Sequence, residues 1–154
     1  EHKKSAGSVV DFPGAKNISN EELLALEVDV LVPAALNSVI TEKNWENIKA
    51  KTIVEIANGP ISLPESTKLF EKGITIIPDV LANSGGVVVS YFEWDQNMKE
   101  ENWELDQVNT KLKEKIVSAF LSIWETKESY NLDMRGAAYV LAVSRILEAE
   151  QNRN

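Results

Sequence analysis

The chain has 154 residues, 44% of them hydrophobic, which fits one folded domain with a proper core rather than a disordered segment. Sixteen Lys and Arg against 24 Asp and Glu give a formal net charge of −8 without a clustered basic run, so nucleic acid and anionic membranes are poor partners. The chain has no cysteine, its one histidine is His2, and no apolar run reaches the roughly 20 residues that span a bilayer. We therefore expect a cytoplasmic protein with no disulfide, no metal site and no membrane segment.

Three short β-branched runs predict strands, and segments with helix signals surround them. The runs are VDVLV (28–32), TIVEI (52–56) and ITIIP (74–78). Ser19 with Glu22 predicts a capping box that opens NEELLAL, Thr41 predicts an N-cap for EKNWENIKA, and Ser62 with Glu65 predicts a cap for PESTKLFEK, which ends at Gly73. This alternation predicts right-handed crossovers and a parallel sheet covered by helices.

Long helices are predicted in the last third of the chain. From Trp103 onward, apolar residues recur every three or four positions on one helical face, and a second helical stretch covers 133–150. The first stripe contains Leu105, Val108, Leu112, Ile116, Phe120 and Ile123, and the second helix carries Ala137, Ala138, Leu141 and Ala142. We interpret both sets as core and docking surfaces rather than as functional sites. The chain then divides into a sheet-containing part, residues 1–102, and C-terminal helices, residues 103–154, that pack on it.

A loop of small residues follows each predicted strand: PAA (33–35), ANGP (57–60) and LANSGG (81–86). Because the carboxyl ends of neighbouring parallel strands lie along one edge of a sheet, the three loops converge on one crevice. Asn58 and Asn83 each supply an amide that both donates and accepts hydrogen bonds, which suits a carboxamide or a ribose edge. The alternative is that these residues are simply what turns and such loops contain. The GxGxxG element is absent, so spacing alone does not predict a complete dinucleotide-binding domain.

Four longer strings follow one another along the chain. They are GSVVDFPGAKNISNEELLALEVDVLVPAAL, IANGP, PDVLANSGGVVVSYFEWDQN and DMRGAAYVLAVSRI. In order and spacing they resemble the carboxyl-terminal part of the glutamate dehydrogenase family. The resemblance implies an α/β fold with a Rossmann-type three-layer αβα parallel sheet that lacks its first βαβ unit and is followed by C-terminal helices. It also implies that VVVSYF (87–92) lies in a helix, whereas β propensity alone favours a strand.

The resemblance also implies which residues bind the cofactor, NAD or NADP. Ala34 and Ala35 match loop positions that line the dinucleotide, and Asn58 and Asn83 match asparagines that contact it near its ribose and nicotinamide. The sequence does not decide between NAD and NADP, because the residues that meet the 2′-position lie upstream of this chain in the family.

The resemblance places Val87 and Ser90 at the substrate. The Ser90 hydroxyl then donates a charge-assisted hydrogen bond to the side-chain carboxylate of glutamate. The local alternative is a helix serine that bonds its own backbone. Two positions depart from the family pattern without removing a polar cofactor contact: Ser84 stands where alanine is common, and Gly136 where threonine is usual.

The activity that the resemblance implies is oxidative deamination of L-glutamate to 2-oxoglutarate and ammonia, with hydride transfer to NAD(P). No residue of this chain matches the family's catalytic lysines or aspartate, so we expect the missing amino-terminal part of the enzyme to supply proton transfer, and the chain alone to be inactive. The family further implies a homo-hexamer. Two alternatives remain: a non-catalytic fragment or assembly module, and the cofactor domain of another amino acid dehydrogenase.

Overall fold

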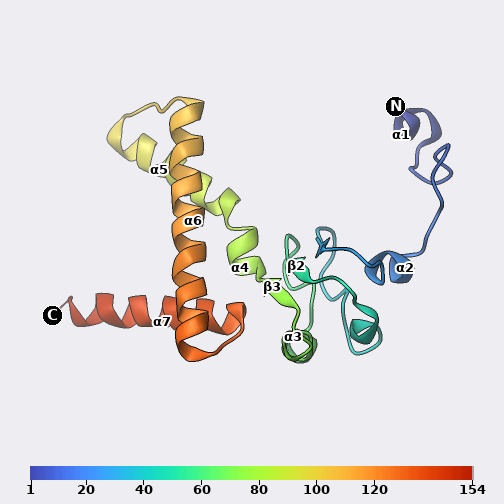
Figure 1. The fold of residues 1–154 in the computed structure, drawn as a ribbon. Helices are drawn as coiled ribbons and strands as arrows, with labels where there is room; N and C mark the ends of the chain where they lie inside the picture. Colours follow the sequence, from blue (N-terminus) through green and yellow to red (C-terminus); the bar gives the residue numbers. More distant parts are fainter. Residues whose placement is uncertain (154) are drawn as a thin grey trace.

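The computed structural model describes residues 1–153 and alternates short strands with helices before it ends in three long helices (Figure 1). In chain order the elements are α1 (His2–Ala6), α2 (Asn20–Leu24), β1 (Val30–Leu31), η1 (Trp45–Asn47), β2 (Thr52–Val54), α3 (Leu63–Glu71), β3 (Thr75–Ile77), α4 (Asp79–Ala82), α5 (Gly85–Lys99), α6 (Leu105–Tyr130) and α7 (Met134–Gln151).

The three strands form one parallel sheet, as the sequence predicts, and the structure gives their order as β1-β2-β3. Ile53 pairs with Leu31 on one side and with Ile76 on the other, so β2 is the central strand. Each strand is shorter than its β-branched run. The pairing of β1 extends past Leu31 only through the Pro33 carbonyl, which accepts hydrogen bonds from the loop after β2. Strand length depends on these partners rather than on local propensity.

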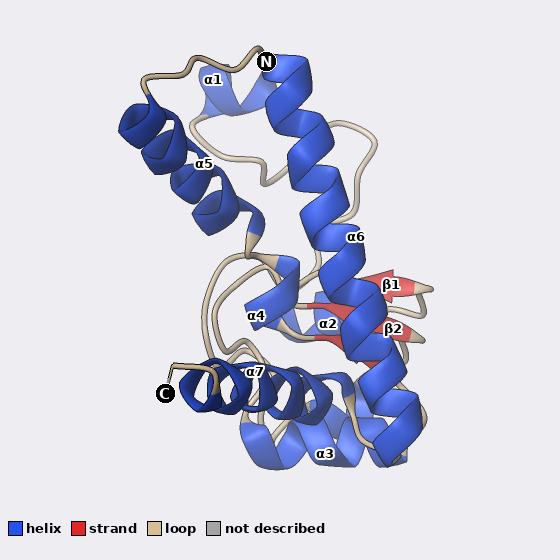
Figure 2. Ribbon diagram, turned by 90° about the vertical axis from the view of Figure 1, so that its left-hand side faces the viewer, coloured by secondary structure: helices blue, strands red, loops and turns tan. Residues whose placement is uncertain are grey.

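Helices cover both faces of the sheet, so the expected three layers are present. Ile53 and Ile76 face a first core that also contains Leu69 of α3 and, at its margin, Leu24 of α2. Ile77, the next residue along β3, points the opposite way and packs against a second core built on α6 and α7. The second core contains Leu81, Ile123, Met134, Ala137 and Ala138. Figure 2 shows α6 crossing the strands on this side.

The helix caps predicted at Ser19 and Ser62 have different outcomes. The capping box at α2 is confirmed: the Glu22 amide donates to Ser19 Oγ at 3.1 Å, and the Ser19 amide donates to Glu22 Oε2 at 2.8 Å. Ser62 stands at the N-cap of α3, but its hydroxyl donates to the carboxylate of Glu65 and to the Ile40 carbonyl instead of accepting an amide. The bridge between Ile40 and Ile61 explains this difference, because it brings the Ile40 carbonyl beside Ser62.

The helix predicted after Thr41 is wrong. Only the single 3₁₀ turn η1 forms there. The Asn44 side chain accepts from the Thr41 amide at 2.8 Å and donates to the Val39 carbonyl at 2.8 Å. These bonds between an asparagine side chain and nearby backbone compete with helix formation. Trp45 packs against the first core, which holds this turn in place.

The strand that propensity favours at residues 87–92 is also wrong, and the helix implied by the family resemblance is confirmed. These residues lie within α5, which packs against α6. Phe92 is buried, and its ring lies 5.7 Å from that of Trp103. The α6 stripe is only partly a core: Ile123 is buried, whereas Leu105, the first residue of the helix, is 72% exposed.

Candidate functional site

The segments that follow β1, β2 and β3 meet at the carboxyl edge of the sheet, as the topology predicts. The loop predicted at residues 81–86 is largely helical, because its first two residues end α4 and its two glycines begin α5, so that Asn83 lies in the short connection between these helices. The Pro33 carbonyl accepts from the amides of Ile56 and Ala57 at 3.1 and 2.9 Å. The Ser38 amide donates to the Gly59 carbonyl at 2.9 Å. Backbone hydrogen bonds therefore join the first loop to the second, and the second and third loops are joined by side chains.

Asn58 and Asn83 contact each other at this edge. Asn83 Nδ2 donates to Asn58 Oδ1 at 2.6 Å and to the Ile56 carbonyl at 3.2 Å. The prediction that both asparagines lie on one side of the sheet is confirmed. Within residues 1–153, Asn83 Oδ1 and Asn58 Nδ2 form no hydrogen bond, so the pair keeps one acceptor oxygen and one donor nitrogen unused.

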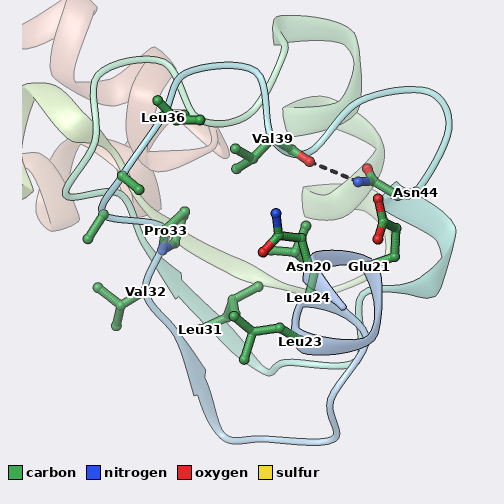
Figure 3. Close-up of a pocket in the computed structure, with 12 residues that line it drawn as sticks. Asn20, Glu21, Leu23, Leu24, Leu31, Val32, Pro33, Leu36, Val39 and Asn44 are labelled. Carbon is green, nitrogen blue, oxygen red and sulfur yellow. Dashed lines mark hydrogen bonds between the residues drawn. The ribbon is translucent and has the colours of Figure 1, made fainter. Parts of the chain in front are cut away.

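Ala34 and Ala35 are exposed and line a cavity of about 560 Å³ between the first loop and α2 (Figure 3). Its walls are mainly apolar, with Leu24, Leu31 and Val39 among them. The lining does not include Asn58 or Asn83. The four predicted cofactor residues therefore lie on adjoining loops but do not share one cavity.

Val87 and Ser90 lie one turn apart on α5, and both are exposed. Ser90 Oγ donates to the Gly86 carbonyl at 3.1 Å, which is the local alternative stated for a helix serine. A substrate role requires the hydroxyl to rotate away from this carbonyl and to donate its one proton to the substrate carboxylate instead. The role of Ser90 stays a prediction.

A largely buried ion cluster, formed by Glu55, Asp79 and Arg135, contacts the segments that follow β2 and β3. Arg135 Nη1 donates to Asp79 Oδ1 at 2.7 Å, and Arg135 Nη2 donates to Glu55 Oε2. The side chains of Glu55, Arg135 and Asp79 are 0%, 12% and 18% exposed. The sequence prediction missed this cluster. Its one local signal was a charged residue inside the β-branched run TIVEI.

The two carboxyl groups of the ion cluster have pKa values shifted in opposite directions. Burial raises the pKa of Glu55 above its ordinary value, and the Asp79 amide and the Arg135 charge offset only part of that effect. Burial also acts to raise the pKa of Asp79, but the Gly59 amide and Arg135 together outweigh it and hold that pKa below its ordinary value. Arg135 therefore faces an Asp79 that stays ionised well into the acid range.

We expect Asp79→Asn to lower the free energy of unfolding at neutral pH and to have a smaller effect on it in acid. Because Asp79 has a lowered pKa in the folded chain, its ionised form stabilises the fold above the unfolded pKa of about 3.9, and this contribution is lost as the pH falls through the folded pKa. Glu55 and Arg135 face this position in both proteins. The difference in free energy of unfolding between wild type and variant should shrink as the pH falls from about 5 to about 3, as urea titrations measure. A difference unchanged at the lowest pH would contradict the assignment.

Within residues 1–153, no group of three or more His, Cys, Asp or Glu side chains could hold a metal ion. None of the helices in that part of the chain combines the length and apolar character needed to cross a membrane.

Comparison with known proteins identifies the family. The sequence model of the glutamate/leucine/phenylalanine/valine dehydrogenases matches residues 1–154. The chain is 49% identical over 152 residues to a glutamate dehydrogenase of Thermotoga maritima and 47% identical over 154 residues to an NAD-specific glutamate dehydrogenase of Clostridioides difficile. In each case the match covers 99% of this chain and 36% of the relative.

A solved structure shows the same fold. The hetero-hexameric glutamate dehydrogenase of Thermus thermophilus superposes with a TM-score of 0.86 at 28% identity, over 99% of this chain and 36% of that one. The fold is thus α/β, of Rossmann type, with C-terminal helices. The chain spans about a third of the length of the relatives that it matches. It belongs to the glutamate/leucine/phenylalanine/valine dehydrogenase family.

Proposed function

We propose that the chain is part of a glutamate dehydrogenase. Residues 1–102 form the distal half of its cofactor domain, and residues 103–154 form its C-terminal helices. The enzyme oxidises L-glutamate with NAD and water to 2-oxoglutarate, ammonia and NADH. The observation that carries the proposal is the meeting of three loops at the carboxyl edge of the sheet, with the Asn58–Asn83 pair at their junction. The relatives named NAD-specific support NAD over NADP.

The residues of this chain would bind and orient rather than transfer protons. The cofactor supplies the hydride chemistry by accepting the hydrogen from the α-carbon of glutamate. Asn83 Oδ1 and Asn58 Nδ2 offer an acceptor and a donor that match a carboxamide, and Ala34 and Ala35 let the dinucleotide approach the backbone closely. Val87 and Ser90 would border the glutamate side chain from α5.

The proposal includes assembly and location. Large apolar side chains are exposed on α5 and α7, including Val87, Trp94, Ile146 and Leu147, and such surfaces are typical of contacts with other chains or domains. We propose that they are covered by the amino-terminal part of the enzyme and by other subunits of a hexamer. A composition without cysteine suits the reducing cytoplasm, where we propose that the enzyme works.

A chimeric enzyme tests the proposal. This chain would replace the corresponding carboxyl-terminal part of the Thermotoga maritima glutamate dehydrogenase, to which it is 49% identical. The chimera is expected to reduce NAD with glutamate and to prefer glutamate to leucine, whereas the 154-residue chain alone should give no turnover. A folded chimera without glutamate oxidation, or turnover by the isolated chain, would contradict the proposal. A preference for leucine would instead support another amino acid dehydrogenase.

A further inference from the structure

We propose that Arg135 is a positioning residue for the cofactor loops: from helix α7 it holds, through Asp79 and Glu55, the two loops that present Asn58 and Asn83. This inference rests on the proposed function, because it concerns the contacts that those asparagines would make with NAD. It adds a residue on a distant helix to a site otherwise built from the sheet loops.

Asp79 connects Arg135 to both loops. Its Oδ1 accepts from Arg135 Nη1 at 2.7 Å, and its Oδ2 accepts from the Gly59 amide at 2.8 Å. Gly59 directly follows Asn58 in the chain. The Asp79 carbonyl accepts from the Asn83 amide at 3.0 Å. The Asp79 side chain therefore bonds the backbone next to Asn58, and the Asp79 main chain forms the helical turn of α4 that ends at Asn83.

Glu55 fixes the orientation of Asp79 and Arg135 from below. It follows β2 directly and is fully buried. Its Oε2 accepts from the Asp79 amide at 2.9 Å and from Arg135 Nη2. The planar guanidinium thus bonds two carboxylates with two nitrogens, a geometry that the single ammonium of lysine does not reproduce.

The start of α7 sets the position of Arg135. Asp133 caps this helix by accepting from the Gly136 amide at 2.6 Å, and Met134, which precedes Arg135, is buried in the second core. Arg135 is separated by 56 and 80 residues from Asp79 and Glu55. Any shift of α7 relative to the sheet is therefore transmitted directly to the two loops.

Stability alone explains this arrangement poorly. Glu55 Oε1 and Arg135 Nε are buried and have no hydrogen-bond partner within residues 1–153. Buried ion pairs with unsatisfied atoms contribute little net stability compared with apolar side chains of similar size. Fixing the geometry of the loops is the contribution that an apolar replacement would not provide.

The test measures NADH binding by fluorescence, and steady-state kinetics, in the complete dehydrogenase proposed above. Arg135→Met is expected to weaken NADH binding about tenfold, as the loss of two aligned hydrogen bonds would, and to leave the KM for glutamate within about twofold. Arg135→Lys should restore only part of the affinity, because it returns the charge but not the planar pair of donors. Arg145→Met, an exposed arginine on the same helix, is the matched control and should change neither value.

A merely structural role would give a different pattern. It would lower Tm and the yield of active enzyme but leave the NADH affinity of the folded fraction unchanged, and that result would overturn the inference. Should Arg135→Met not fold, Asp79→Asn tests the same connection with a side chain of equal shape, and unchanged NADH affinity in that variant would overturn it as well.

Two further variants separate this inference from the proposed function. If Asn58→Ala and Asn83→Ala weaken NADH binding and the Arg135 variants do not, only the positioning role fails. If the asparagine variants bind NADH normally, the cofactor contacts of the proposed function fail, and the positioning role fails with them whatever the Arg135 variants do.

Discussion

Replacing Glu55 by Ala is expected to lower the free energy of unfolding by about 3 to 5 kcal/mol, the cost typical of breaking a buried ion pair by removing one partner. The Glu55 side chain is 0% exposed, and Oε2 accepts from the Asp79 amide and from Arg135. Its removal takes one of two carboxylate partners from the Arg135 guanidinium, which is only 12% exposed, and the acceptor from the Asp79 amide, in a site that water does not readily reach. Urea unfolding of the chain, followed by circular dichroism, measures the change.

Glu65→Ala is the matched control. Glu65 is also buried, and it is paired with Lys68 at 3.1 Å, but the Lys68 side chain is 43% exposed. Water solvates that ammonium when the carboxylate is removed, so the loss should be only about 1 kcal/mol. Equal losses for the two variants would show that burial of the carboxylate, rather than the buried arginine, determines the effect.

A double-mutant cycle isolates the pair itself. Arg135→Met with Glu55→Met removes both members together, so neither of these two charges is left without the other, while Asp79 loses Arg135 in the double variant as it does in Arg135→Met alone. The double variant should therefore lose less stability than the sum of the losses in Arg135→Met and Glu55→Met, with a coupling energy of about 1 to 3 kcal/mol. Additive losses would mean that the two side chains act independently, despite the hydrogen bond between them.

The order of elements in this fold can be predicted from sequence because its signals are local. The β-branched runs, the capping box at Ser19 and the glycine at Gly73, which has a φ of 86°, each specify structure through nearby residues. Residues 87–92 could not be predicted by propensity, because they form part of α5 and pack against α6, and this packing partner is not visible in the local sequence. The turn at Trp45 depends on hydrogen bonds between the Asn44 side chain and nearby backbone, and helix propensity does not predict such bonds.

Only the part of the site that depends on the topology of the sheet could be predicted from sequence. Because parallel strands end along one edge of the sheet, topology predicts that Asn58 and Asn83 lie close together, although it does not predict the hydrogen bond between them. The ion cluster depends on where α7 begins against the sheet, which no local pattern encodes. Arg135 lies 56 residues from Asp79 in the chain, and its position in α7 does not distinguish it from any other charged residue of a helix.

Replacing Ser90 by Ala tests the residue for which the local and family interpretations differ. A free hydroxyl donor to a substrate carboxylate would give a loss of about 1.5 to 3 kcal/mol, or roughly 10- to 150-fold in kcat/KM for glutamate. In the structure this donor already bonds the Gly86 carbonyl at 3.1 Å, so substrate would exchange one hydrogen bond for a stronger one. The net loss should then fall at or below the lower end of that range, about 5- to 15-fold.

Selectivity distinguishes the two interpretations of Ser90. If its hydroxyl binds the side-chain carboxylate, Ser90→Ala should leave the kinetics with norvaline almost unchanged, because norvaline lacks that group, and so should narrow the preference for glutamate. NADH affinity should not change. Thr126, whose hydroxyl donates to the Ser122 carbonyl at 2.8 Å on α6, has the same kind of local bond, and Thr126→Val is the control that should leave both substrates unaffected. If Ser90→Ala behaves like this control, Ser90 serves only its own helix, and the glutamate pocket must draw its carboxylate selectivity from other residues.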